Sequence, residues 1–213
     1  FNCVNGIGSQ IGPLISSHAD VNMISFTGST LAGVNIQELA ANSVKRVSLE
    51  LGGKSAHIIC PGVDLKIAIP NAIDQCFINS GQSCSAPTRL LIPKEDVSEV
   101  KRISMEYAES IVTGNPDNES TNLGPVINLK QYESIQKYIK SGIDDGYEII
   151  TGGLGKPNDC INGYFIKPTI FLNVKNSSLI AQEEIFGPVL SIISYIDICL
   201  LYTSDAADEH NCV

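Results

Sequence analysis

The sequence predicts an α/β fold with a largely parallel sheet. Short apolar segments alternate with longer segments of helical periodicity, and turns rich in Gly, Ser and Pro separate them. Of the 213 residues, 43% are hydrophobic and 17% are charged, which is an ordinary globular composition with enough apolar material for a substantial core. The length allows one large domain, or one domain with part of another.

Six segments are predicted to be strands, because they are short and rich in apolar or β-branched residues. They span residues 22–26, 45–51, 56–60, 88–92, 147–151 and 164–171. Pro93 ends the fourth segment. Pro168 in the last segment indicates an edge strand, since proline cannot donate a ladder hydrogen bond.

Five segments have the spacing of apolar residues that is typical of helices. They are residues 9–17, a segment from Thr30, residues 64–77, the segment after Pro93, and a segment that Asn128 caps. Gly142 is expected to end the last of these helices. Pro70 lies inside 64–77 and predicts either a kink or a late start.

The turn at residues 27–30 joins a predicted strand to a predicted helix. Free N–H groups and the helix dipole converge at such a turn, which makes it a candidate anion site. Gly28 and Gly33 have the spacing of a triphosphate-binding loop, but Val34 and Asn35 stand where Lys and Ser/Thr would be needed, so that interpretation is excluded. A simple helix cap by Ser29 or Thr30 is the alternative, and it can hold at the same time.

Cys84 lies in the stretch F-I-N-S-G-Q-S-C-S-A-P-T-R, residues 77–89. Small and polar side chains surround it between a helical segment and a strand, so we expect a chain reversal that leaves the sulfur uncovered. A thiolate nucleophile needs such a place, reachable by substrate and close to backbone N–H groups or a helix N-terminus. The alternative is a buried, inert cysteine, the commonest fate of a free thiol.

Glu50 lies in a second motif, L-E-L-G-G-K-S-A, residues 49–56. It ends a predicted strand between Leu49 and Leu51, and burial among apolar neighbours would make its carboxylate a better general base near neutral pH. Gly52 and Gly53 allow a tight turn and the close approach of a ligand to the backbone. The alternative is a glutamate that faces solvent.

These two stretches resemble signatures of the aldehyde dehydrogenase family. L-E-L-G-G-K-S is similar to the family's glutamate signature and F-I-N-S-G-Q-S-C-S-A to its cysteine signature, and their separation along the chain also fits. F-T-G-S-T at residues 26–30 and E-E-I-F-G-P-V at residues 183–189 are two further matches, in the right order. The resemblance runs from Phe1 to about Tyr195 and covers the middle of the family's full-length protein.

The resemblance implies a partial aldehyde dehydrogenase-like fold, formed by the end of a Rossmann-like cofactor domain and most of an α/β catalytic domain. Residues 1–52 would be the C-terminal part of the dinucleotide-binding domain. Residues 53–195 would be an incomplete catalytic domain that carries the thiol nucleophile. Residues 196–213 depart from the family pattern and form a separate tail.

The resemblance also implies an oxidoreductase that converts an aldehyde to a carboxylic acid with NAD, and NADP is not excluded. Cys84 would form the thiohemiacetal and thioester, and Glu50 would activate water. The implied cofactor contacts are Gly28, Ser29 and Gly33 at the pyrophosphate, Leu51 and Gly52 beside them, and Glu184 and Phe186 at the nicotinamide-side ribose. Without the resemblance, Glu183 and Glu184 would be interpreted as a solvated acidic pair.

The family's oxyanion asparagine, its cofactor-binding lysine and the residues that separate NAD from NADP lie upstream of the matched region. We therefore expect the 213-residue chain to lack turnover, although its parent is an enzyme, a homodimer or homotetramer. Two alternatives remain open. One is a non-catalytic nucleotide-binding remnant, and the other is a cofactor-independent thiol acyltransferase or hydrolase, which would need a histidine base.

Charge and composition exclude several partners. The net charge is −9 and neither Lys nor Arg forms a run, which argues against nucleic acid and anionic membranes. No apolar stretch approaches about 18 residues and no signal peptide opens the chain, so a cytoplasmic location is expected. The seven cysteines are irregularly spaced, without C-x-x-C or a nearby histidine, so neither a disulfide framework nor a metal site is predicted.

The end of the chain is expected to be non-native, and the start at Phe1 without methionine suggests truncation. Residues 199–209 resemble translated adapter or cloning-junction sequence more than protein. Resequencing the locus tests this hypothesis, and a continuous genomic reading frame through the segment would contradict it.

Overall fold

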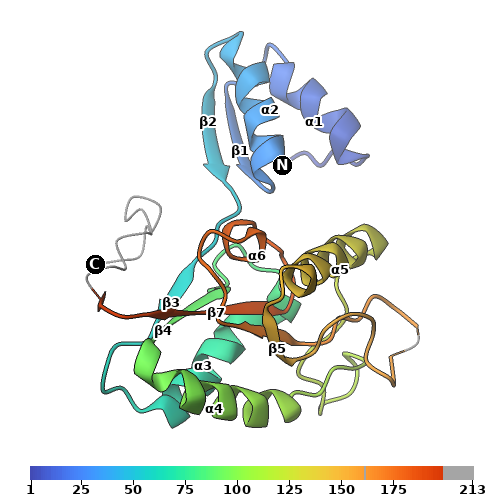
Figure 1. Ribbon diagram of the computed structural model, residues 1–213. Helices are drawn as coiled ribbons and strands as arrows, with labels where there is room; N and C mark the ends of the chain where they lie inside the picture. Colours follow the sequence, from blue (N-terminus) through green and yellow to red (C-terminus); the bar gives the residue numbers. More distant parts are fainter. Residues whose placement is uncertain (161, 199–213) are drawn as a thin grey trace. The chain divides into compact units, whose positions relative to one another are not determined.

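The structure is a computed structural model that describes residues 1–160 and 162–198 (Figure 1). The chain divides into two compact units, Phe1–Gly52 (unit 1) and Gly53–Val213 (unit 2). The division falls between the paired glycines of the Glu50 motif. Which unit has which function stays a prediction at this point, and most of the tail hypothesis falls on residues 199–213, outside the described residues.

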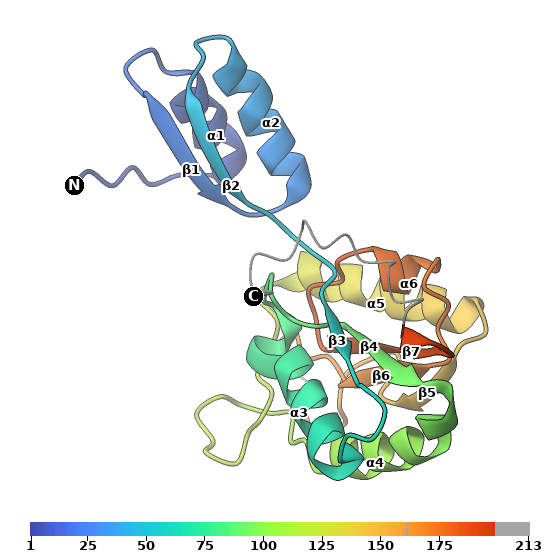
Figure 2. The same ribbon diagram turned by 90° about the vertical axis from the view of Figure 1, so that its left-hand side faces the viewer.

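Unit 1 is a small β-α-β arrangement with one additional helix. Its elements are α1 (Gly8–Ser17), β1 (Met23–Thr27), α2 (Thr30–Ala41) and β2 (Arg46–Glu50). The two strands are parallel, with Met23 opposite Arg46 and Thr27 opposite Glu50. Figures 1 and 2 show both helices on the same face of the strands. Along β1 and β2 the residues alternate between exposed and half-buried, so unit 1 alone buries neither strand completely.

Unit 2 contains a five-stranded sheet in the order β3-β4-β7-β6-β5. The strands are β3 (Ala56–Ile58), β4 (Arg89–Pro93), β5 (Glu148–Thr151), β6 (Thr169–Leu172) and β7 (Val189–Tyr195). All neighbours are parallel except β5, which runs antiparallel to β6. The predicted α/β class with a largely parallel sheet is therefore confirmed.

Helices cover both faces of this sheet (Figure 1). On one face lie α3 (Leu65–Phe77) and α4 (Val97–Glu109), and on the other lie α5 (Leu129–Asp144) and the short α6 (Leu179–Gln182). The 3-10 helix η1 (Ile78–Gly81) directly follows α3. A second 3-10 helix, η2 (Lys94–Asp96), directly precedes α4. The result is a three-layer arrangement in which a mostly parallel sheet is covered on both sides.

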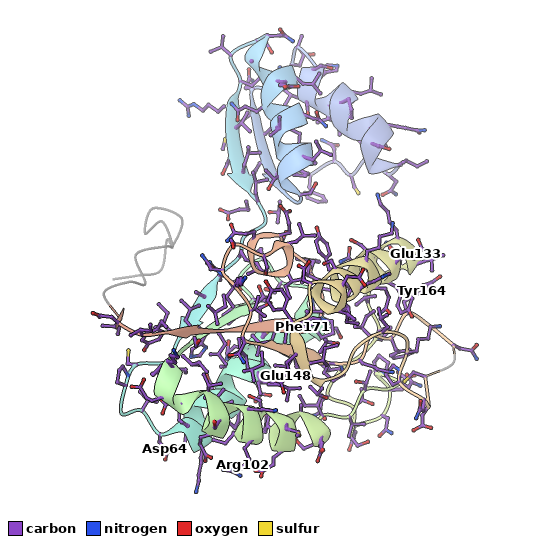
Figure 3. The ribbon with its side chains drawn as sticks, in the orientation of Figure 1. Asp64, Arg102, Glu133, Glu148, Tyr164 and Phe171 are labelled. Atoms are coloured by element: carbon purple, nitrogen blue, oxygen red, sulfur yellow. The ribbon has the colours of Figure 1, made fainter. Side chains whose placement is uncertain are left out.

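The side chains of the sheet alternate between two cores. Leu90 and Ile92 of β4 point into the core beneath α3 and α4, whereas Leu91 points into the core beneath α5. Phe171 of β6 is fully buried in the second core, and Figure 3 shows it in the interior, while Asp64 and Arg102 lie at the surface. Apolar side chains on alternate faces thus fix the register of each strand.

Two features of the sequence prediction were wrong, the strand at residues 164–171 and the end of the helix at Gly142. The strand predicted at 164–171 begins only at Thr169 and is internal, between β7 and β5. Pro168 therefore precedes the strand and needs no ladder partner, which removes the argument for an edge. Gly142 does not end its helix, because α5 continues to Asp144 and Gly142 is packed against the Phe171 ring. Of the two alternatives for Pro70, the late start is excluded, because the helix begins at Leu65 with Asp64 as its N-cap.

The central strand β7 was not predicted at all. Its sequence, V-L-S-I-I-S-Y, is a short apolar run of the kind that buried parallel strands have. Such a run does not alternate with polar residues, so periodicity alone does not separate it from a loop or a helix. No helix within residues 1–160 and 162–198 is long and apolar enough to cross a membrane.

Candidate active site

The carboxyl ends of β1 and β2 bring Gly28, Ser29 and Glu50 together in unit 1. The Gly28 N–H donates to the Glu50 carbonyl oxygen at 3.0 Å, which ties the turn after β1 to the end of β2. Ser29 is the N-cap of α2, and its hydroxyl oxygen accepts from the Ala32 N–H at 3.3 Å. The capping interpretation of Ser29 is therefore correct. The same turn also has the strand-turn-helix geometry in which α/β proteins bind anions.

Gly33 and Leu51 are in contact. A Cβ on Gly33 would lie 2.7 Å from Leu51 Cδ2, so the lack of a side chain at Gly33 lets Leu51, just after β2, pack closely on α2. Gly33 is buried and Leu51 is half-buried. The structure thus gives both residues a packing role within unit 1, and their contacts with a cofactor stay a prediction.

Glu50 is exposed at the end of β2, between two half-buried leucines. The burial that the sequence led us to expect for this carboxylate is absent from unit 1. The physical reason is that β2 has only one neighbouring strand there, and its side chains alternate between half-buried and exposed positions.

Cys84 lies in a tight turn between η1 and β4, and it is exposed as predicted. The Ala86 N–H donates to the Ser83 carbonyl oxygen at 3.2 Å, so Cys84 and Ser85 are the central residues of the turn. The hydroxyl oxygens of Ser83 and Ser85 lie 3.1 Å apart and flank the cysteine. No helix starts at this turn, so no helix dipole acts on Cys84. The groups that could stabilise a bound oxygen atom are the backbone N–H groups of the turn.

Cys76 and Cys160 differ from Cys84 because they are buried. Burial raises the pKa of the Cys76 thiol to about 12 and also raises that of Cys160. Both therefore remain protonated at neutral pH and behave as small apolar side chains. Among the residues that the structure describes, no group of three or more His, Cys, Asp or Glu side chains could hold a metal ion.

The amino ends of three parallel strands converge at the Cys84 turn. Cys84 precedes β4, Gly53 and Lys54 precede β3, and Glu184 precedes β7. A Cβ on Gly53 would lie 3.7 Å from the Cys84 carbonyl oxygen, so the two backbones are close. The Gly53 N–H also lies on the side of Glu184, where it opposes the rise in the pKa of that carboxylate. Gly53 thus lies beside the Cys84 turn and near Glu184 of the E-E-I-F-G-P-V motif, although the three residues are far apart in the sequence.

Glu184 has an unsatisfied carboxylate oxygen. Its Oε1 is buried and accepts no hydrogen bond. Burial raises the pKa of Glu184, while the Gly53 N–H and the Lys54 ammonium oppose that increase. Phe186, two residues on, is half-buried with a φ of 54°. A buried acceptor without a partner is costly unless a ligand or water supplies the donor.

Lys54 lies in the motif around Glu50, but it was not predicted to be a site residue. Its Nζ is buried without a hydrogen-bond partner. Burial and, to a smaller extent, the Arg89 charge lower the pKa of Lys54 to about 8, against the opposing effects of Cys76, Glu184 and Glu183. Because the Cys76 thiol is itself neutral, the carboxylates are the effective opposing charges. No sequence signal other than its place in the motif would have identified this buried cation.

Arg89 and Gln82 are two further residues that the sequence argument missed. Arg89 Nε donates to the Lys54 carbonyl oxygen at 2.8 Å and holds the strand that starts after the glycine turn. Gln82 donates to the Asn79 carbonyl oxygen and accepts from the Ile127 N–H at 3.0 Å. Asn79 in turn donates to the Gln82 carbonyl oxygen, so its amide is used for the loop itself.

Comparisons with known proteins agree with the motifs. The aldehyde dehydrogenase family matches residues 1–199. A 3-succinoylsemialdehyde-pyridine dehydrogenase from Pseudomonas sp is 46% identical over 197 residues, which is 92% of this chain and 41% of that protein. The chain therefore belongs to the aldehyde dehydrogenase family, and it spans about two fifths of the length of the curated relatives that it matches.

Solved structures are similar in fold as well as in sequence. An aldehyde dehydrogenase C variant from Pseudomonas syringae, complexed with NAD+ and octanal, has a TM-score of 0.91 and 43% identity over 92% of this chain and 40% of that one. An aldehyde dehydrogenase from Bartonella henselae has a TM-score of 0.87 and 45% identity over 91% and 40% of the two chains. The fold is therefore a partial aldehyde dehydrogenase fold, as the resemblance implied.

Proposed function

We propose that the parent of this chain oxidises an aldehyde to a carboxylic acid with NAD+ or NADP+. The observation that carries the proposal is the exposed Cys84 turn, which lies beside Gly53 and near Glu184, whose carboxylate has a buried oxygen without a hydrogen-bond partner. Family membership supports it, as do similar structures complexed with NAD+, including that of Bacillus cereus, and one complexed with NADP.

The cofactor fits the residues that are present. Ribose hydroxyls would satisfy the buried Glu184 Oε1, and Phe186 would lie against the same sugar. Gly28 and Ser29 would face the pyrophosphate at the start of α2, with Gly33, Leu51 and Gly52 beside them. When it is bound, the nicotinamide supplies the hydride acceptor for the reaction.

The residues of the chain divide the remaining chemistry. The Cys84 thiolate attacks the carbonyl carbon of the aldehyde to form a thiohemiacetal, whose oxyanion the Cys84 backbone N–H stabilises together with an asparagine from outside this chain. Loss of hydride leaves a thioester on Cys84. Glu50 then removes a proton from the water that attacks the thioester, which releases the acid and restores the thiolate.

The test uses the full-length protein that contains this sequence, assayed for reduced cofactor with simple aliphatic aldehydes. Cys84→Ser should lose at least about 10³-fold in turnover, because the hydroxyl is a far weaker nucleophile without an activating base. Glu50→Gln should keep a stoichiometric burst of reduced cofactor and lose about 10²–10⁴-fold in steady-state rate. Undiminished turnover in Cys84→Ser would contradict the proposal.

The 213-residue chain itself is expected to show no turnover, because the family's oxyanion asparagine and cofactor lysine lie outside it. Alkylation of Cys84 with and without NAD+ separates the remaining alternatives. A rate that responds to the cofactor supports a dehydrogenase, and an indifferent rate favours a non-catalytic remnant. A cofactor-independent thiol enzyme needs a histidine base, and no hydrogen bond among the described residues pairs a histidine with Cys84. A cytoplasmic location and a dimeric or tetrameric parent remain part of the proposal.

A further inference from the structure

The amino end of α5 contacts both loops of the candidate site. Gln131 Nε2 donates to the carbonyl oxygens of Ile185 at 3.1 Å and Phe186 at 3.0 Å. Just before the helix, the Ile127 N–H donates to the side chain of Gln82, which lies in the loop that carries Cys84. One helix end is therefore hydrogen-bonded to two loops, residues 183–187 (the acidic loop) and residues 78–88 (the nucleophile loop).

The acidic loop needs such support because its backbone is strained. Phe186 has a φ of 54°, in the left-handed region that favours glycine. Two successive carbonyl groups converge on the single Gln131 amide nitrogen, which has two N–H donors. The next residue, Gly187, lies directly on α5, since a Cβ there would be 2.5 Å from Ile135 Cδ1. The Gln131 amide and the Ile135 side chain thus fix the shape of the loop.

The acidic loop also contacts the nucleophile loop directly. Gly81 has a φ of 71°, and a Cβ on it would lie 2.2 Å from the Gly187 carbonyl oxygen. The two glycine backbones are therefore in van der Waals contact, three residues before Cys84 and one residue after Phe186. A shift of Phe186 and Gly187 would displace Gly81.

We propose that Gln131 is a positioning residue that holds Phe186 and, through the Gly187–Gly81 contact, the Cys84 turn. It acts through the backbone of the acidic loop and not through its own contact with a cofactor. The inference rests on the proposed function in one respect, namely that the ligand beside Phe186 is the nicotinamide cofactor. The mechanical link between Gln131 and Cys84 does not depend on it.

The same helix provides a matched control. Gln136 is also half-buried on α5, and its side chain also bonds to a loop backbone, accepting from the Gly155 N–H at 2.7 Å. Gln136→Met removes one accepted hydrogen bond and Gln131→Met removes two donated ones, with the same replacement side chain on the same helix. Only Gln131 contacts the acidic loop.

The first measurement needs no cofactor and uses the 213-residue chain. Gln131→Met should speed amide hydrogen exchange in residues 183–187 by about tenfold, the effect of losing a net stabilising hydrogen bond, and should change the rate of Cys84 alkylation by iodoacetamide several-fold. Gln136→Met should leave both rates unchanged. Equal rates in the two variants would overturn the proposal.

The second measurement uses the full-length protein and a double-mutant cycle on the dissociation constant for NAD+. Gln131→Met should raise this constant about tenfold in the wild-type background and not at all beside Phe186→Gly, because glycine adopts the left-handed backbone without support. Additive effects would show that Gln131 contacts the cofactor itself and would overturn the positioning role. If the wild-type protein binds neither NAD+ nor NADP+, the proposed function fails, and the exchange and alkylation rates decide the present proposal.

Discussion

Gly81 shows how a single residue sets the distance between two loops of the candidate site. Its φ of 71° disfavours any side chain, and its neighbour is the backbone of Gly187, which has no flexible end to move aside. Gly62 provides a contrast, because it has a φ of 83° and open space where a Cβ would be. Alanine substitutions at Gly81 and Gly62 therefore separate the cost of backbone strain, which both share, from the cost of a steric clash, which only Gly81 would have.

We predict that Gly81→Ala lowers the free energy of unfolding by about 3 kcal/mol or more, and Gly62→Ala by about 1 kcal/mol. The larger effect reflects the clash with the Gly187 carbonyl group in addition to the strain. Urea unfolding of the two variants measures both values. Equal losses would contradict the close approach of the two loops.

Lys54 is the residue whose charge should affect stability most visibly. Burial lowers its pKa to about 8 from 10.5, so the unfolded chain binds more protons at this residue between these two pH values. The contribution of Lys54 to the free energy of unfolding should therefore rise with pH in that window. Below about pH 8 the buried ammonium lowers the stability of the fold.

Lys54→Met removes this contribution and its pH dependence. The stability of the variant relative to the wild type should be highest at pH 7 and should fall by up to about 3 kcal/mol as the pH rises to 10.5. Measuring unfolding of both proteins across this range cancels the titration of the other side chains. A difference that does not change with pH would show that Lys54 is not desolvated.

At the scale of elements, α5 connects the core to the site. Its inner residues Ile135 and Ile139 are fully buried. Ile127, just before the helix, is hydrogen-bonded to the loop around Cys84, and Gln131 in its first turn to the loop around Phe186. Asn128 caps the helix by accepting from the Gln131 N–H at 2.9 Å, so the residue that supports the acidic loop also lies in the capped turn. Packing of α5 and geometry of the site are therefore coupled.

Gly142→Ala tests how closely α5 lies on the sheet. Alanine is normally the better helix former by about 1 kcal/mol. Here its Cβ would lie 2.8 Å from the buried Phe171 ring, so we expect a net loss of stability of about 1–2 kcal/mol. Combining it with Phe171→Leu, which removes ring atoms at the contact, should reduce the loss, as thermal unfolding can measure. A stabilised Gly142→Ala would mean that the helix has room to move outward.

At the scale of the whole molecule, the two units differ in how completely they bury their own sheets. Unit 2 covers both faces of five strands with helices. Unit 1 has two parallel strands whose residues are nowhere fully buried, although parallel sheets are normally covered on both faces. Its own core is therefore too small to give it much stability.

We predict that limited proteolysis of the 213-residue chain cleaves unit 1 well before unit 2. Local opening should be easiest where few apolar contacts form, so thermolysin should leave a protected product that begins near residue 53. Mass spectrometry of the time course identifies the cut sites. Cleavage of both units at the same rate would show that unit 1 is as stable as unit 2.

Much of the fold could be predicted from local patterns. The helices around Ile73, Val100 and Ile135 follow from apolar spacing, and Ser29 and Asn128 act as caps as their residue types indicate. The misses have a common cause. Pro168, Gly142 and the β7 run have several local interpretations, and the choice among them depends on residues that are distant in the sequence. Pro168 lies next to an internal strand, and Gly142 is required by the Phe171 ring.

The sequence by itself determined the family, the α/β class and the chemical types of the candidate site, because short motifs around Glu50, Cys84 and Glu184 carry that information locally. Only the tertiary structure decided that Gly53 lies beside the Cys84 turn and near Glu184, that Lys54 is a buried cation, and that Gln131 is hydrogen-bonded to a strained loop. These relations arise because β3, β4 and β7 are parallel neighbours, so their amino ends lie at the same end of the sheet. Strand order is a property of long-range packing, and no local pattern encodes it.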